Sequence, residues 1–302
     1  MTIPGLTGAI GPRPSTHPVD GKGLSGTEDH LSDVQHIEGP GVWLASSRGW
    51  VLREGDISCA VAGNVDWLDK ELANAQTKRD PAHALLQAFR VHGPDLLQII
   101  GGRFAICVWD QRNRTGLVAC DRFGQLPVFW ARTPDGQLLI APTATAVNDL
   151  TGSPPRLSDQ GIYNYLYYHM VPAPDTVFEG VHKLMAAHAL FAEDGDWRVG
   201  RYWAPDFRET ADASLSHAAE EMLGLLSSSV ARLADSEQTG AFLSGGLDSS
   251  TVAGLLAGYR PHPTTYSIGF KADGYDEIAY ARMASEHFQT DFRTYYVTPE
   301  DV

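Results

Sequence analysis

The sequence of 302 residues lacks three features that would each assign it to a broad class of protein. It has only three cysteines, its 23 Lys and Arg are outnumbered by 37 Asp and Glu, and no apolar run approaches the roughly 20 residues of a membrane span. A net charge of −14 argues against a broad basic surface for nucleic acid. The N-terminal stretch MTIPGLTGAIGPRPSTHP has neither the basic region nor the long apolar run of a secretory signal. We therefore expect a cytoplasmic protein that binds neither nucleic acid nor membranes.

The few cysteines and histidines also lack the spacing of a metal centre. Cys59, Cys107 and Cys120 stand singly in apolar segments, which fits neither a disulfide framework nor a zinc site. We predict three buried structural thiols. His169, His182 and His188 likewise lack ligand spacing and are predicted to be core or surface residues.

The first two-thirds of the chain are rich in short β-like segments. With 43% hydrophobic residues, a chain of this length is expected to form about two domains. Helical patterns occupy 67–75 and 81–93, and the second opens with Pro81 and closes with Gly93. Strands are predicted over 42–47, 57–63, 103–110, 116–124, 127–132 and 137–142. Strands in runs with helices between them predict an α+β sandwich, in which two sheets are covered by helices.

The last third alternates helices and strands instead. Helices are predicted over 214–233, 249–258 and 276–288, and strands over 240–244, 264–270 and 292–297. This alternation predicts an α/β doubly wound parallel sheet. The boundary between the two patterns falls near residues 203–210.

A loop rich in glycine and serine, SGGLDSS at residues 244–250, lies where a predicted parallel strand ends and a helix begins. Such sheets bind ligands at this place, and the helix N-terminus attracts an anion. Gly245 and Gly246 let the backbone curl around phosphate, while Ser244, Ser249 and Ser250 offer hydroxyl donors. Asp248 would repel a bare phosphate, so it predicts a magnesium ion. The alternative is an ordinary turn in which Asp248 or Ser249 caps the helix. No GxxxxGK[ST] motif of a Walker-type NTPase occurs.

The same loop resembles the pyrophosphate-binding loop of the asparagine synthetase family, whose members split ATP into AMP and pyrophosphate. Residues 101–130, 171–190 and 266–288 also resemble segments of that family. The resemblance implies that Leu243 and Ile268 contact adenine through main-chain atoms. It implies that pyrophosphate and Mg²⁺ are held by Ser244, Gly245, Gly246, Asp248, Ser249 and Ser250, with Asp248 as the metal ligand. The implied chemistry is adenylation of a carboxylate, followed by attack of an amine to form an amide.

By the same resemblance, the N-terminal part should be a glutaminase whose N-terminal cysteine is the nucleophile. Here PGLTG matches the family's start with Pro4 in the place of the cysteine. The family's Asn-Gly-Glu segment corresponds to Ala62, Gly63 and Asn64, so that only the glycine is kept. We therefore expect a vestigial glutamine site and no glutamine hydrolysis.

Two further residues bear on that expectation. Asp80 matches the carboxylate that holds the substrate amine, but it is equally well placed to cap the helix that begins at Pro81. Thr2 is an alternative N-terminal nucleophile, with its own amine as base, and its offset from the family position disfavours it.

Two other stretches have plainer interpretations. Asp121 and Arg122 in DRFG look like a catalytic pair, but at a strand end such residues more often fix a turn. The aromatic run YNYLYYHM, residues 163–170, predicts a helix-packing surface rather than a platform for stacking nucleic-acid bases.

We predict that residues 1–205 form a degenerate glutaminase-like sandwich. Residues 206–302 are predicted to form the first part of an ATP-binding domain like the adenine nucleotide α-hydrolases. The resulting function is ATP-dependent, AMP-forming amide synthesis from a carboxylate without glutamine hydrolysis. Alternatives are asparagine synthesis from free ammonia, a lasso-type peptide macrocyclase and a β-lactam-synthetase-like ligase. From another class, the alternative is a non-catalytic nucleotide-binding or scaffold protein.

The chain stops at VTPEDV, before the place where the family supplies a second glycine-rich acidic loop and further catalytic residues. We therefore expect a fragment, a relic, or a protein completed by a second chain. The expected partners are ATP and a carboxylate, with a peptide substrate or a homo-oligomer also compatible with the sequence.

Overall fold

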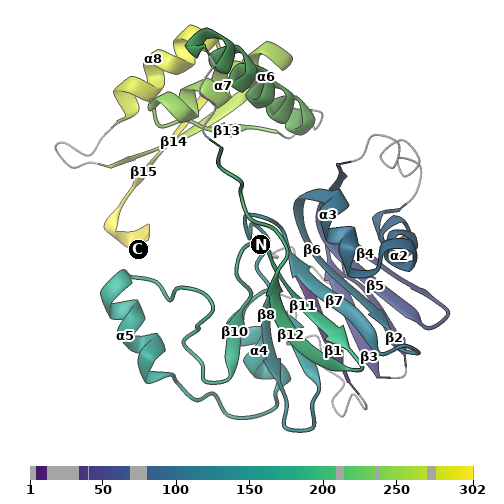
Figure 1. The fold of residues 1–302 in the computed structure, drawn as a ribbon. Coiled ribbons are helices and arrows are strands. Elements are labelled where there is room, and N and C mark those ends of the chain that lie inside the picture. Colours follow the sequence, from purple (N-terminus) through teal and green to yellow (C-terminus); the bar gives the residue numbers. More distant parts are fainter. Residues whose placement is uncertain are drawn as a thin grey trace. The chain divides into compact units, whose positions relative to one another are not determined.

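The computed structural model describes residues 5–11, 34–39, 41–68, 80–208, 214–234, 239–270 and 277–301 (Figure 1). The chain divides into two compact units, Met1–Asp206 and Phe207–Val302. The predictions for Thr2 and Pro4 lie outside the described residues, as does most of the helix predicted over 67–75. The first residue of that helix, Trp67, instead ends a strand. Of the described helices, none is long and apolar enough to cross a membrane.

Two six-stranded antiparallel sheets build the first unit. One has the strand order β10-β8-β9-β1-β3-β2 and the other β12-β11-β7-β6-β5-β4. The strands of the first sheet are β1 Gly5–Ile10, β2 Val34–Gly39, β3 Val42–Ser47, β8 Phe129–Arg132, β9 Leu138–Ala141 and β10 Val181–Lys183. Those of the second are β4 Gly49–Glu54, β5 Ile57–Trp67, β6 Ile100–Asp110, β7 Thr115–Cys120, β11 His188–Glu193 and β12 Asp196–Arg201.

Side chains from both sheets form one buried cluster, which includes Leu44 of the first sheet and Cys107 and Val118 of the second. A further cluster places α2, Pro81–His92, and α3, Leu96–Ile99, on the other face of the second sheet. Helix α4, Ala144–Leu150, packs on the other face of the first sheet. Each sheet can pack against the other sheet on one face and against helices on the other, because successive side chains of a strand point to opposite faces. The predicted helix over 81–93 is confirmed.

All three cysteines are buried in this unit, as predicted. Burial raises the pKa of the Cys59 and Cys107 thiols well above the ordinary range. It raises the pKa of Cys120 to about 11. The thiols are therefore protonated at neutral pH, and they contribute to packing as small apolar groups.

The second unit holds three parallel strands in the order β13-β14-β15. Its elements are α6 Leu215–Ala234, β13 Ala241–Phe242, α7 Leu247–Tyr259, β14 Thr264–Phe270, α8 Ile278–Phe288 and β15 Asp291–Val297, followed by a short 3-10 turn, η4 Pro299–Asp301. Along β14, Thr265 and Ser267 are buried while Tyr266, Ile268 and Phe270 are exposed. Thus α7 and α8 cover one face of this sheet. All six elements predicted here form, and the doubly wound arrangement, with helices on both faces, stays a prediction.

Candidate functional site

The glycine-rich loop connects β13 to α7, and its backbone shape requires glycine. Gly245 has a φ of 82°, and a Cβ there would lie 2.5 Å from the Ala281 nitrogen of α8. A side chain at this position would therefore be both strained and blocked. Gly246 is the N-cap of α7, and within residues 239–270 no side chain caps the N-terminus of this helix. The first N–H groups of α7 are consequently available to a ligand.

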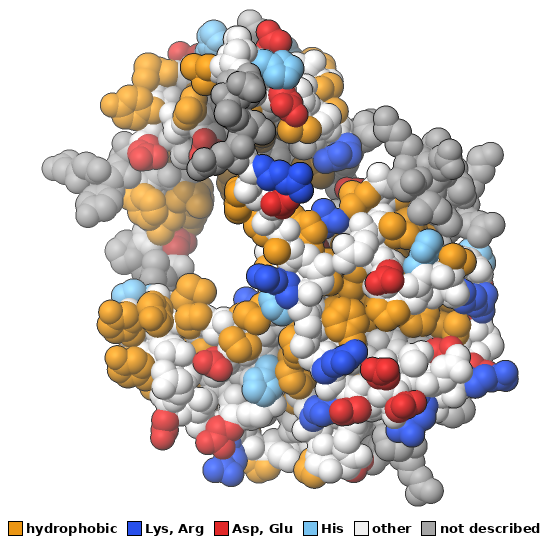
Figure 2. Space-filling model, in the orientation of Figure 1, with side chains coloured by type: hydrophobic (Ala, Val, Ile, Leu, Met, Phe, Trp, Pro, Cys, Tyr) orange, Lys and Arg blue, Asp and Glu red, His pale blue; other side chains and the backbone are white. Residues whose placement is uncertain are grey.

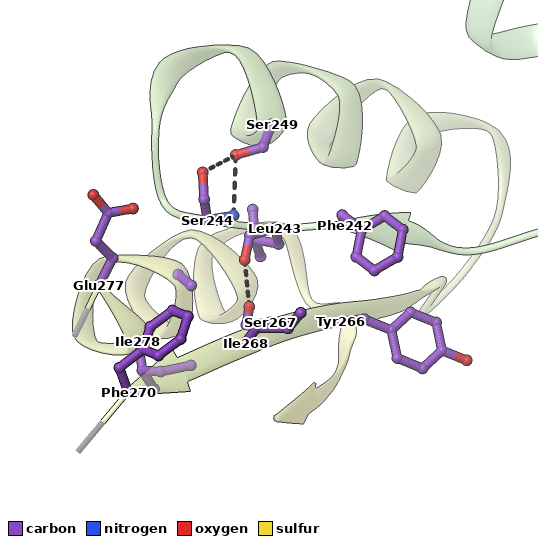
Figure 3. A pocket seen from close by; sticks show the side chains of 11 residues that line it. Phe242, Leu243, Ser244, Ser249, Tyr266, Ser267, Ile268, Phe270, Glu277 and Ile278 are labelled. Carbon is purple, nitrogen blue, oxygen red and sulfur yellow. Dashed lines mark hydrogen bonds between the residues drawn. The ribbon is translucent and has the colours of Figure 1, made fainter. Parts of the chain in front are cut away.

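Two serine hydroxyls face one another across the loop (Figure 3). The Oγ atoms of Ser244 and Ser249 are 2.9 Å apart, and the Ser244 N–H donates to the Ser249 Oγ at 3.1 Å. The Gly246 N–H donates to the Ser244 Oγ at 3.3 Å. The Ser249 hydroxyl also donates to the Gly246 carbonyl at 3.3 Å, so of the two hydroxyls it is that of Ser244 that keeps capacity for a further hydrogen bond. The pair therefore forms a polar edge that could bind phosphate oxygens.

A pocket of about 420 Å³ lies beside this polar edge. It brings together four of the predicted residues, Leu243, Ser244, Ser249 and Ile268. The other four, Gly245, Gly246, Asp248 and Ser250, belong to the loop or the first turn of α7 and do not line the pocket. Sequence reasoning missed the remaining lining residues, which are Phe242, Tyr266, Ser267, Phe270, Glu277, Ile278 and Ala281.

The lining is apolar on one side and polar on the other. Ile268 and Phe270 are exposed residues of β14, and they could cover the face of a flat ring. The Glu277 carboxylate stands at the edge of the pocket, at the start of α8 (Figure 3). The sequence TTYSIGF could have indicated the apolar side of the pocket, because alternate residues of a strand share one face.

The main chain at the ends of β13 and β14 is arranged asymmetrically. The Leu243 N–H donates to the Tyr266 carbonyl at 2.8 Å, and the Leu243 carbonyl accepts the Ser267 hydroxyl. The pairing of β13 with β14 ends at Phe242 and Tyr266. Main-chain groups of a strand alternate in direction, so the N–H and C=O of Ile268 face the side on which β13 has ended. Ile268 is therefore better placed than Leu243 to contact a base through main-chain atoms.

Metal ligands are sparse in the described part of the chain. It contains no group of three or more His, Cys, Asp or Glu side chains that could hold a metal ion. Asp248 is exposed in the first turn of α7, where it could supply one carboxylate oxygen. His169 ends α5 (Asp159–Tyr168), His182 lies against Trp130 with ring centres 4.7 Å apart, and the Nδ1 of His188 is 2.8 Å from the Ala186 carbonyl oxygen.

The predicted vestigial glutamine site lies within strand β5. Ala62 is fully buried in β5 and pairs with Ala105, while Asn64 pairs with Arg103. Gly63 has a φ of 81°, and a Cβ there would collide with the Arg103 carbonyl oxygen. The need for glycine at this position is therefore explained by the sheet itself.

Asp80 acts as the helix cap, which was one of its two interpretations. Its Oδ1 accepts the His83 N–H at 2.9 Å, and Pro81 follows in the first turn of α2. This bond satisfies one of the free N–H groups of the first turn. Whether Asp80 also binds a ligand stays a prediction.

Asp121 fixes a turn, as predicted. Its side chain is fully buried and accepts the N–H groups of Phe123, Gln125 and Leu126 at 3.0, 3.2 and 3.1 Å. Arg122 donates to the Ile100 carbonyl at 3.3 Å. Both residues therefore hold the chain in place after β7.

The aromatic run over 163–170 lies mostly on α5. Tyr163 and Tyr167 are 60% and 66% exposed, and their rings stack on one another at 6.2 Å. Figure 2 shows hydrophobic side chains gathered over this helix. The described residues provide no helix against which the run packs, because α5 buries only Gly161. The predicted helix-packing surface is not found here.

Two family profiles match the chain in succession. The glutamine amidotransferase domain family matches residues 64–203, and the asparagine synthase family matches residues 221–302. A solved structure of glutamine phosphoribosylpyrophosphate amidotransferase from Bacillus subtilis, with ADP and GMP, matches 97% of this chain and 60% of its own. Its TM-score of 0.38 and identity of 12% are too low to support an argument.

Curated relatives match across both parts. A Mycobacterium tuberculosis protein, provisionally named a glutamine-hydrolysing asparagine synthetase, is 29% identical over 67% of this chain and 32% of its own length. A similarly named protein from Methanocaldococcus jannaschii is 28% identical over 83% of this chain and 50% of its own. Asparagine synthetase 3 of Bacillus subtilis is 27% identical over 69% and 35%. The matched region thus spans about a third to a half of each relative.

Proposed function

Because the chain belongs to the asparagine synthetase family, we propose that its second unit binds ATP with Mg²⁺ in the pocket beside residues 244–250. The bound ATP serves to activate a carboxylate for amide-bond formation. The observation that carries this proposal is the juxtaposition of an uncapped helix N-terminus, the Ser244 and Ser249 hydroxyls, and a pocket of about 420 Å³.

The residues present fit a nucleoside triphosphate. The N-terminus of α7 and the two hydroxyls offer donors to phosphate oxygens, while Ile268 and Phe270 offer apolar surface to a base. Asp248 would hold Mg²⁺ beside the phosphates, where the ion supplies positive charge against the negative charge of the phosphates. Glu277 is a further carboxylate at the same pocket.

In the proposed reaction, a carboxylate oxygen of the substrate attacks the α-phosphorus of ATP, and the bond to the β-phosphate breaks to release pyrophosphate. An amine then attacks the acyl carbon and displaces AMP, which leaves an amide. The loop would hold the pyrophosphate portion in place, because its N–H groups and hydroxyls are positioned before the reaction begins. Which carboxylate and which amine react, and whether a partner chain takes part, depends on the whole protein.

For the first unit, we propose a glutaminase-like sandwich without glutamine hydrolysis. The sequence has Pro4 where the family has its nucleophile, and Ala62 and Asn64 flank Gly63 in place of the family's glutamine-binding pair. Ala62 is fully buried in β5 and has no side chain that could stabilise an oxyanion. The amine used in the synthetase reaction would then come from free ammonia or from the acceptor substrate itself.

Binding of ATP and exchange of labelled pyrophosphate into ATP test this proposal. We expect the chain to bind ATP with Mg²⁺, and Ser244→Ala to weaken that binding. Ser228→Ala is the matched control, because the Ser228 hydroxyl donates to the Leu225 carbonyl within α6. Carboxylate-dependent exchange would support adenylation. Absence of ATP binding, or equal binding by the Ser244 variant, would contradict the proposed site, and binding without exchange would favour the nucleotide-binding protein without turnover.

A further inference from the structure

The end of β13 carries a hydrogen bond that a regular parallel sheet would not contain. Ser267 is 5% exposed, and its hydroxyl donates across the strands to the Leu243 carbonyl. This side chain belongs to the buried face of β14, under α7 and α8, but it also lines the pocket. Ser267 thus connects the helix-covered face of the sheet to the proposed nucleotide site.

In a regular parallel ladder, the Leu243 carbonyl would accept a different donor. After the bond from the Leu243 N–H to the Tyr266 carbonyl, the next bond should run from the Ile268 N–H back to the Leu243 carbonyl. Within residues 239–270 the Ile268 N–H makes no such bond, and the Ser267 hydroxyl is the donor to this carbonyl. The ladder between β13 and β14 therefore stops one step early.

We propose that Ser267 is a positioning residue that sets the base specificity of the pocket, an inference that rests on the proposed binding of ATP. The Ser267 hydroxyl donates to the Leu243 carbonyl, and with this bond in place the Ile268 N–H does not close the ladder. The N–H and C=O of one extended residue point the same way, so Ile268 presents a donor beside an acceptor. This pair matches adenine, which offers an acceptor at N1 and a donor at its amino group. Hypoxanthine offers the reverse, a donor at N1 and an acceptor oxygen.

Removal of the hydroxyl tests this role. In Ser267→Ala the Leu243 carbonyl loses its donor, and the Ile268 N–H can take its place. The ladder would then extend by one bond, and the donor facing the base would be lost. Ser267→Thr keeps a hydroxyl and should retain the wild-type arrangement. Thr265→Val is the matched control, because Thr265 is a fully buried residue on the same face of β14 whose hydroxyl contacts Thr290 at 2.8 Å.

The experiment compares binding of ATP, ITP and pyrophosphate in the presence of Mg²⁺. A single hydrogen bond is typically equivalent to roughly a two- to tenfold change in affinity. Ser267→Ala should weaken ATP binding by about that factor and leave pyrophosphate binding unchanged. The preference for ATP over ITP should fall in the same variant, while Thr265→Val and Ser267→Thr keep it.

Amide hydrogen exchange provides a second measurement that needs no ligand. The Ile268 amide should exchange rapidly in the free wild-type chain and become protected in Ser267→Ala. An unchanged ATP-to-ITP preference overturns the role of Ser267 even if ATP binds, and so does an equal loss of ATP and pyrophosphate binding, which would indicate general damage to the pocket. Wild-type protein that binds neither ATP nor pyrophosphate would instead refute the proposed function.

Discussion

Asp121 and Asp248 both lie in glycine-containing stretches that follow a strand, yet their surroundings are opposite. Asp121 is fully buried, and its carboxylate accepts three backbone N–H groups. Asp248 is exposed in the first turn of α7. Both residues lie in segments that resemble the family, but they differ in the internal hydrogen bonds of the carboxylate. These bonds give Asp121 a structural role, whereas the role of Asp248 in binding Mg²⁺ is a proposal.

The same difference distinguishes the two units. In the first, residues that match the glutaminase pattern have structural explanations, since Asp80 caps α2 and Gly63 fits against β6. In the second, four of the eight residues implied by the synthetase resemblance line a pocket.

The largest effect is expected from Asp121→Ala. The change leaves three backbone N–H groups without their acceptor, which should lower the free energy of unfolding of the first unit by on the order of 3 kcal/mol. Urea unfolding measures this loss. Asp149→Ala, at an exposed position in α4, should change it by no more than about 0.5 kcal/mol. If Asp121→Ala were as stable as the wild type, the structural role of this aspartate would be refuted.

Asp248→Ala should have the converse effect, on binding and not on stability. Loss of one charge-assisted contact typically costs about 1.5–3 kcal/mol, which is about tenfold or more in affinity for ATP with Mg²⁺. Calorimetric titration with and without Mg²⁺ measures it. Equal affinity of the variant and the wild type under both conditions would show that Asp248 acts only at the helix N-terminus.

A smaller effect is expected from Asp80→Ala. Removal of an N-cap side chain typically costs about 1 kcal/mol of stability, while Asp80→Ser keeps a capping oxygen and should lose a few tenths at most. Denaturant unfolding of the three proteins measures the series. Stabilisation of the wild type by glutamine, absent in Asp80→Ser, would instead show that the carboxylate is a ligand.

The smallest expected signal is that of glutamine hydrolysis, which should be absent. Purified protein incubated with glutamine should release no glutamate above the background without enzyme, because Pro4 stands where the family has its nucleophilic cysteine. Thr2→Ala is the informative variant. Glutamate release that disappears in this variant would establish threonine as the nucleophile. The first unit would then have a catalytic site of its own.

Local signals in the sequence predicted much of the fold. Asp80 and Pro81 at the start and Gly93 at the end were enough to place α2, and the alternation after residue 206 located β14. Strands β10, β11 and β12 were not recognised, because they are only three to six residues long. Such short strands acquire their conformation from pairing with distant partners, such as β7 for β11.

The candidate site was predictable along the loop and, through the family resemblance, at Ile268 of β14. Ser244 and Ser249 are near in sequence and form one constellation, whereas Phe242, Ser267 and Glu277 meet there through parallel pairing and helix packing. Period-two alternation in TTYSIGF could have indicated that Tyr266, Ile268 and Phe270 share a face. Nothing in the sequence gives the hydrogen bond of Ser267 to the Leu243 carbonyl, because it depends on where the ladder of β13 ends.

The burial of all three cysteines makes the chain suitable for fluorescent labelling at a chosen point. Thiol reagents need the thiolate, and burial keeps Cys59, Cys107 and Cys120 protonated and inaccessible in the folded state. A cysteine introduced at Leu247, which is 83% exposed in the first turn of α7, would then carry the dye alone. Its emission would report what happens at the loop without background from the rest of the molecule.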